Sequence, residues 1–446
     1  MNFFIEYFYG LNRVLFLGIL SIVGIIYYFF LRFVSLNIFD PLMLLGVFAS
    51  FSTSLVFYMF FMGDVQAVQF YSFLAVIITF WIGYLFAYLL WGRRYKSAVV
   101  SFVDNSILKK DAYFFLSLTL FFLLVIPTLV LFWYRGVPIL SENPSDAKVL
   151  LYANGFGAIR YVHFIIPAVL AYLLLAQLFA GRFFNLGRLL KLKGLTLFFM
   201  LLVALAVPVL LGSKGALLFI LGGFSMIAYW YQRYGSKKVR AIYFSAVVFV
   251  LVAAIFAIIV SILTPYSSAN PLISLAIRFL ASGDVFFFYY GFDISNEFEV
   301  QWFDFLAYIF DPLLAFFGAA EHSYPLGAYV LHYSTGWPLG SFGPNAQLPV
   351  LLNIYFGSLF SAVLALAFGL LVGFLRMKMF VILMKVKFVG PFFALFLWAS
   401  SASVLTDLNF FVSRFWFVVV VFVPILFIYY IVVTSSRRSS SKWRNI

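Results

Sequence analysis

The segment Tyr113–Tyr134, with the sequence YFFLSLTLFFLLVIPTLVLFWY, contains 22 consecutive residues, none of which is charged. About 20 apolar residues suffice for an α-helix to cross the hydrocarbon core of a bilayer. Because lipid cannot hydrogen-bond to exposed backbone groups, a stretch of this kind crosses the membrane as a helix. The segment therefore predicts a membrane protein.

Similar apolar stretches recur along the whole sequence. Of the 446 residues, 65% are hydrophobic and 10% are charged, whereas a soluble domain has about 25% charged residues. We therefore expect an all-α polytopic protein that forms a single integral membrane domain over residues 1–446, with about eleven transmembrane helices. The predicted spans are approximately 14–34, 41–61, 69–91, 113–134, 161–180, 195–211, 216–232, 241–264, 346–375, 389–407 and 412–434.

The distribution of basic residues predicts the topology. Of the 29 lysines and arginines, 22 fall in short connecting segments or in the C-terminal tail, all of which can share one side of the membrane. Most of them lie in 92–112, 181–194, 233–240, 376–387 and 435–446. The positive-inside rule places these segments in the cytoplasm, which leaves the first extracytoplasmic loop at 135–160 and a large one at 265–345. The net charge of +14 then faces anionic membrane lipids rather than nucleic acid.

The large extracytoplasmic loop contains two apolar stretches that carry charges. Arg278 and Asp284 interrupt Leu272–Phe292, whereas Asp304, Asp311 and Pro312 interrupt Trp302–Phe317. Such composition suits helices that lie in the membrane interface better than helices that span it.

A few basic residues are not explained by cytoplasmic retention. A cation within the bilayer costs about 2.5–3.5 kcal/mol on insertion scales and is a functional candidate by default. Arg160, Lys214, Arg278 and Arg414 come from separate segments, yet all are expected near the outer surface. Guanidinium groups bind phosphate oxygens in a bidentate manner, so this set suits a pyrophosphate. Taken singly, each of them could equally be a structural ion pair or an interfacial anchor.

Histidines and aromatic residues in the outer loops supply further candidates. His332 is the first candidate for a general base, and Glu321 and Asp284 follow it. An ordinary polar contact is the competing explanation for a loop histidine. The candidates for substrate binding are Arg135, His322, Tyr329, Trp337 and Tyr355, although aromatic residues also gather at membrane interfaces. With three histidines and no cysteine, we expect neither a metal site nor a cofactor.

Several short motifs resemble one family when they are taken in order. Residues 135–140 and 155–168 are similar to the first outer loop of the bacterial O-antigen and oligosaccharide-repeat-unit polymerases (the Wzy family), and Gly212-Ser-Lys-Gly215 resembles their Gly-Ser/Thr-Arg-Gly turn. The segment around Arg278 resembles their second-loop arginine helix. Residues 343–357 and 407–417 resemble the re-entering stretch and the terminal span. Lys214 departs from the family pattern, because lysine offers a point charge where arginine offers a fork.

The resemblance implies a metal-independent glycosyltransferase of the GT-C type in the bacterial inner membrane, with its active site facing the periplasm. Its substrates would be undecaprenyl-pyrophosphate-linked oligosaccharides, and its partners would include a chain-length regulator and a repeat-unit flippase. An O-antigen ligase-like transferase would share the donor and differ in the acceptor. A lipid-linked oligosaccharide flippase or another transporter is the alternative outside the enzymes, and it should carry charges at the bilayer midplane and internal symmetry.

Overall fold

The computed structural model is entirely helical over the residues it describes. These residues are 2–35, 37–92, 111–141, 147, 150–152, 157–181, 192–211, 223–225, 227–228, 240, 242–248, 251, 282–319, 324–340, 343–384, 390–422 and 427. Seven helices within them are long and apolar enough to cross a membrane. By helix length and hydropathy the chain is a multi-pass membrane protein, which confirms the predicted fold class at this level.

The long helices follow the predicted spans closely. They are α2 (Arg13–Val34), α3 (Pro41–Met62), α4 (Ala67–Ala87), α7 (Asp111–Arg135), α9 (Gly157–Gly181), α11 (Leu192–Leu210) and α18 (Leu348–Met384). The spans predicted after residue 388 appear as two shorter helices, α19 (Gly390–Ser400) and α20 (Leu408–Phe417). The spans predicted at 216–232 and 241–264 lie largely outside the described residues, so the count of eleven stays a prediction.

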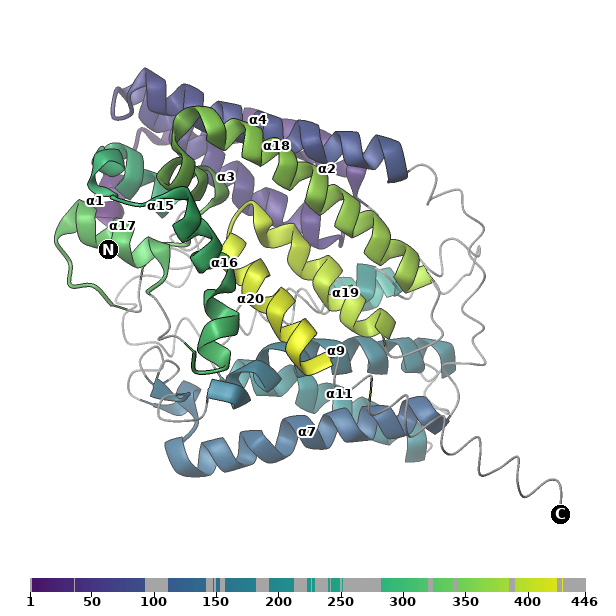
Figure 1. The fold of residues 1–446 in the computed structure, drawn as a ribbon. Coiled ribbons are helices and arrows are strands. Elements are labelled where there is room, and N and C mark those ends of the chain that lie inside the picture. Colours follow the sequence, from purple (N-terminus) through teal and green to yellow (C-terminus); the bar gives the residue numbers. More distant parts are fainter. Residues whose placement is uncertain are drawn as a thin grey trace, which may run out of the picture.

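Short helices gather at one end of the molecule, where α4 and α18 begin (Figure 1). They are α1 (Asn2–Gly10), α15 (Asp284–Phe286), α16 (Trp302–Phe316) and α17 (Leu326–Thr335). We call this the loop end of the bundle. The helix predicted at Trp302–Phe317 is confirmed as α16, whereas the stretch predicted at Leu272–Phe292 is described only from residue 282 onward.

Glycines allow α4 and α18 to pack closely side by side. A side chain at Gly83 would meet the backbone of Leu366, and one at Gly369 would meet the backbone of Phe80. Further along both helices, a side chain at Gly373 would meet α4 again, at residues 84 and 87. The paired residue numbers rise together, so the two helices run parallel. Small residues at such crossings are typical of helix packing in membranes.

Helix α9 is the centre of the other half of the bundle. Its side chains from Ile165 to Phe179 are buried on every side, and a helix that is apolar all round belongs inside a bundle. His163 near its start is also buried, and its two ring nitrogens lie 2.9 Å from the Thr128 hydroxyl and 3.0 Å from the Tyr152 hydroxyl. Both nitrogens are therefore satisfied by structural hydrogen bonds.

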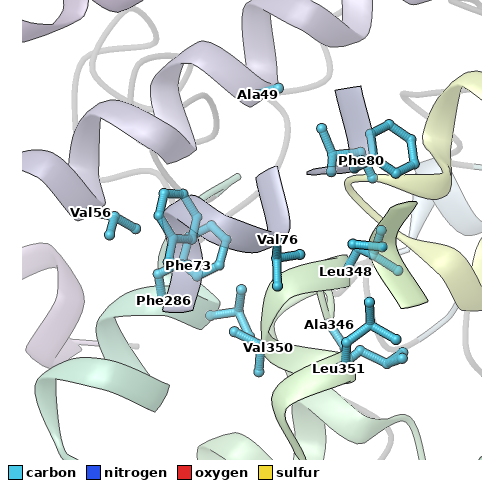
Figure 2. Packing of buried hydrophobic residues seen from close by; sticks show 14 of the residues in the cluster. Ala49, Val56, Phe73, Val76, Phe80, Phe286, Ala346, Leu348, Val350 and Leu351 are labelled. Carbon is cyan, nitrogen blue, oxygen red and sulfur yellow. The ribbon is translucent and has the colours of Figure 1, made fainter. Parts of the chain in front are cut away.

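A second hydrophobic core fixes the loop end onto the long helices. Phe286 of α15 packs edge-to-face on Phe73 of α4, with ring centroids 5.1 Å apart. Figure 2 shows these two rings together, with Val350 from the first turn of α18 nearby. Burial of such side chains contributes roughly 1.5–3 kcal/mol each. The start of α18 and the short helix α15 are thus anchored to the same core.

One prediction about charge is wrong. The sequence places Arg376 in a basic cytoplasmic loop at 376–387, but α18 continues to Met384 and Arg376 is 1% exposed. Its Nη2 donates to Asp40 Oδ1 at 2.8 Å, and its Nη1 donates to the Trp398 carbonyl at 2.9 Å. The helix continues past the arginine, and the charge of the guanidinium is paired with Asp40 inside the bundle.

Candidate functional site

Helix α16 has chemically distinct faces. The Asp304 carboxylate caps its first turn by accepting a hydrogen bond from the backbone N–H of Gln301 at 2.8 Å. Asp304, Tyr308 and Asp311 share one side of the helix, because residues at i, i+4 and i+7 lie above one another. Other positions expose large apolar side chains, namely Trp302, Phe303, Leu306, Phe310 and Leu314. A helix that is polar on one side and apolar on another suits a membrane interface.

Contacts with two membrane helices hold α16 across the bundle. Phe305 is buried against Tyr355 and Phe356 of α18, with ring centroids 5.6 Å and 5.1 Å away. Trp416 of α20 donates its indole N–H to the carbonyl of Ile309 at 2.9 Å. Figure 1 shows α16 crossing the direction of the long helices. Its polar face is therefore held at the loop end.

Helix α17 supplies the facing wall. Gly327 and Gly343 bring its first turn into backbone contact with the segment at Pro344, where a side chain on either glycine would clash with backbone atoms. The helix ends at Gly336, whose φ of 68° favours glycine. Tyr329 and Tyr333 are four residues apart, so they lie on the same side of α17.

A pocket of about 590 Å³ lies between these walls. This volume falls in the range of pockets that hold small molecules, about 300–1,000 Å³. Its lining residues are Asn296, Glu297, Phe298, Glu299, Val300, Asp304, Ala307, Tyr308, Asp311, Tyr324, Leu326, Tyr329, Tyr333 and Tyr355. We call it the tyrosine–carboxylate pocket. Five tyrosines and four carboxylates line it, and none of the lining residues is a lysine, arginine or histidine.

The pocket chemistry suits a ligand rich in hydroxyl groups. Carboxylate oxygens accept hydrogen bonds from hydroxyls, and phenol groups both donate and accept. Tyrosine rings also offer flat apolar faces with a polar edge. Among the described residues, no group of three or more His, Asp or Glu side chains is placed to hold a metal ion. The carboxylates are therefore spread along the walls rather than gathered for coordination.

Two predicted substrate-binding residues meet in this pocket. Tyr329 and Tyr355 are 26 residues apart in the sequence and line the same cavity. Trp337 is not among the lining residues, and it is 62% exposed. Its carbonyl accepts a hydrogen bond from His332 Nδ1 at 2.7 Å. Because a carbonyl can only accept, Nδ1 carries the proton and Nε2 is left as the basic nitrogen of a neutral His332.

His332 lies in a helix beside the pocket rather than in an extended loop. It is the neighbour of Tyr333 on α17, and their rings are 5.4 Å apart. It is not itself a lining residue. Of the other base candidates, Glu321 lies outside the described residues, and Asp284 sits at the start of α15. His322, a candidate for substrate binding, also lies outside the described residues.

Asp284 is a buried carboxyl group. Burial raises its pKa to about 7, which backbone hydrogen bonds partly offset. Its Oδ1 is buried without a hydrogen-bond partner among the described residues. The preceding residue, Gly283, lies close to α3, where an added side chain would meet the backbone of Ser52. Asp284 does not line the tyrosine–carboxylate pocket.

The predicted cation cluster is described in part. Arg160 is exposed on the first turns of α9, with its guanidinium 5.5 Å from the Phe164 ring centre. Arg414 is 6% exposed and lies 3.3 Å from the ring centre of Phe410, in contact with the end of α19 through Ser400. Lys214 and Arg278 lie outside the described residues. The convergence of the four cations therefore stays a prediction.

Arg135 is described too. It is exposed at the end of α7 and does not line the tyrosine–carboxylate pocket.

The carboxylates of the pocket are the residues that sequence reasoning missed. Asp304 and Asp311 are visible in the sequence only as charges that interrupt an apolar stretch, and Glu297 and Glu299 look like ordinary loop residues. The i, i+4, i+7 spacing of Asp304, Tyr308 and Asp311 is a signal that could have revealed a polar helix face.

Compared with known proteins, the chain matches no family model, no curated protein and no solved structure.

Proposed function

We propose that the chain is a membrane glycosyltransferase that joins undecaprenyl-pyrophosphate-linked oligosaccharide repeat units into a surface polysaccharide such as O-antigen. The observation that carries the proposal is the tyrosine–carboxylate pocket, at the loop end of a multi-pass membrane protein. A pocket built from phenol rings and carboxylates suits a saccharide, and the apolar face of α16 suits a substrate that is anchored in lipid.

The proposed reaction needs a base and a way to stabilise the leaving group. The acceptor hydroxyl oxygen forms a bond to the anomeric carbon of the donor, the bond from that carbon to the pyrophosphate oxygen breaks, and the pyrophosphate leaves with the electron pair. The hydroxyl proton passes to a protein base. The proposal assigns this role to Asp304 or Asp311, which line the pocket, or to His332, the neighbour of the lining residue Tyr333.

The departing pyrophosphate requires positive charge. Preorganised cations stabilise charge that develops in a transition state, and the proposal assigns this role to Arg160, Lys214, Arg278 and Arg414. Because the described lining residues include carboxylates and no cation, the proposal places the pyrophosphate beside the tyrosine–carboxylate pocket rather than in it. The proposal places the active site in the periplasm and assigns a chain-length regulator and a repeat-unit flippase as partners.

The alternatives differ in what the pocket would bind. An O-antigen ligase-like transferase would use the same donor but would transfer the glycan to a different acceptor. A transporter would carry its charges at the bilayer midplane. Here the buried ion pair joins Asp40, which caps the start of α3, to Arg376 about two turns before the end of α18. Its position near helix ends does not favour the transporter.

Analysis of the products made by purified protein tests the proposal. The protein in liposomes would receive the undecaprenyl-pyrophosphate-linked repeat unit isolated from its host. We expect a ladder of longer lipid-linked glycans, and we expect it to persist in EDTA because no metal ligands are placed together in the described residues. Unchanged substrate would contradict any transferase. Movement of the substrate across the bilayer without elongation would favour the transporter.

A further inference from the structure

The lining of the tyrosine–carboxylate pocket is one-sided in charge. Glu297, Glu299, Asp304 and Asp311 are the charged side chains among the described residues that line the pocket, and all four are acidic. Like charges brought close together repel, and the repulsion is stronger where a cavity wall excludes water. The negative charge of these carboxylates therefore repels anionic ligands and attracts cationic ones.

The pocket is also a shaped cavity and not only a group of acidic residues. Its volume of about 590 Å³ is enclosed by tyrosines that come from three helices and one loop. The buried Tyr308 hydroxyl has the backbone of Asn409 as its hydrogen-bonding neighbour. Because a phenol group both donates and accepts, a saccharide hydroxyl could form a second hydrogen bond with it.

We propose that this pocket selects its saccharide by charge: it prefers a sugar unit with a free, protonated amino group, accepts a neutral one and rejects uronic acids and other anionic sugars. The inference rests on the proposed function, which supplies the saccharide. It deepens that function by naming the substrate class. The selectivity arises as much from repulsion of the wrong sugar as from attraction of the right one.

The same charge argument orients the lipid-linked substrate. Carboxylates repel a pyrophosphate unless a cation neutralises it, and the described residues of the lining supply carboxylates and no cation. The saccharide therefore enters the tyrosine–carboxylate pocket, while the pyrophosphate and its lipid stay outside, on the side where α16 exposes its apolar face.

Binding of three soluble trisaccharides to the purified full-length protein tests the inference. The probes are a glucosamine trimer, an N-acetylglucosamine trimer and a galacturonic acid trimer, measured by calorimetry at mildly acidic pH and at low and high salt. We expect affinity to fall in that order, with the spread between probes narrowing at high salt.

Two variants separate the pocket from general surface charge. Glu297 and Glu299 are exposed on the rim, so the double variant Glu297→Gln/Glu299→Gln should fold normally. It should weaken binding of the glucosamine trimer by up to about fivefold per lost carboxylate, the upper range for exposed ion pairs. The matched control is Glu6→Gln in α1, which removes an exposed carboxylate outside the pocket and should leave the order unchanged.

The binding results support or overturn the proposed charge selectivity. Equal binding of the three trimers, preference for the galacturonic acid trimer, or an order that survives the double variant would overturn the inference. Failure of all three trimers to bind would overturn it as well. Glycan elongation is measured separately, so a protein that elongates lipid-linked units without the charge order refutes only this inference. A protein that shows the charge order but never elongates refutes only the proposed polymerase.

Discussion

At the scale of single residues, Asp311 is the pocket carboxylate that gives the first test of the proposed base. Asp304 also caps α16, so its replacement would disturb the helix start. Asp311 lies a turn and a half before the end of α16, on the pocket side. General acid–base catalysis typically contributes 10²–10⁴-fold to a rate.

We predict that Asp311→Asn lowers the rate of glycan elongation by about 10²–10⁴-fold if Asp311 is the base. Binding of the neutral trisaccharide should change much less, because asparagine keeps the shape and one acceptor oxygen. Single-turnover elongation by wild type and variant gives the comparison, with Glu6→Gln as the control. A variant that elongates at the normal rate would move the role of base to Asp304 or His332.

Asp284 gives a second residue-scale prediction, one that concerns stability. Its pKa rises from 3.8 to about 7 on folding, so the folded state holds a proton that the unfolded state releases. Stability due to this group is therefore fully present below about pH 4 and is lost as the pH rises toward 7. Asp284→Asn mimics the protonated form, and it should be more stable than wild type at about pH 8 but not at about pH 4.

Thermal unfolding in detergent across this pH range measures the difference. An advantage of Asp284→Asn that is the same at both pH values would show that Asp284 does not change protonation on folding.

At the scale of helices, the break in α18 shapes the pocket. Gly357 has φ 69° and ψ 175°, a conformation that is essentially restricted to glycine. It lies two residues after Tyr355, which lines the pocket, and four after Asn353, which donates to the Tyr290 hydroxyl at 3.1 Å. The break thus lies between Tyr355, which lines the pocket, and the glycines at 369 and 373, where α18 approaches the backbone of α4 most closely.

We predict that Gly357→Ala destabilises the protein by about 1–3 kcal/mol. There is open space around this position, so the cost would come from the backbone and not from a clash. Gly24→Ala in α2 is the matched control, since it also faces open space but has ordinary helical geometry, where alanine is favoured. Equal stability of the two variants would mean that α18 tolerates a regular helix at residue 357.

The helices also show how much of the fold can be predicted from the sequence. Long apolar runs predicted the membrane helices well, and an apolar stretch with charges predicted α16, because hydropathy and length are local properties. Arg376 was misplaced because nothing in the local sequence reveals Asp40, 336 residues away, as its ion-pair partner. Tyr329 and Tyr355 were predicted from their residue type, but their meeting in one pocket with Glu297 depends on tertiary packing.

At the scale of the whole molecule, the distribution of charge predicts sidedness. Reporter fusions at Lys110, Lys193 and Lys238 should report the cytoplasm, as the positive-inside rule requires. Fusions near Ser141 and at Asn296 should report the opposite side. Asn296 lines the tyrosine–carboxylate pocket, so its location decides which compartment the pocket faces. A cytoplasmic signal from Asn296 would place the pocket on the wrong side for an enzyme of periplasmic glycan synthesis.

The central claim is that the saccharide of a lipid-linked substrate occupies the tyrosine–carboxylate pocket, and photo-crosslinking tests it most directly. The probe is an N-acetylglucosamine trimer on undecaprenyl pyrophosphate, with a diazirine on the sugar farthest from the lipid. Mass spectrometry of the labelled protein should locate the crosslinks within residues 296–311 and 324–333, and excess unlabelled probe should abolish them. Crosslinks confined to α7, α9 and α11, or to the end of the bundle around Arg376, would contradict the claim.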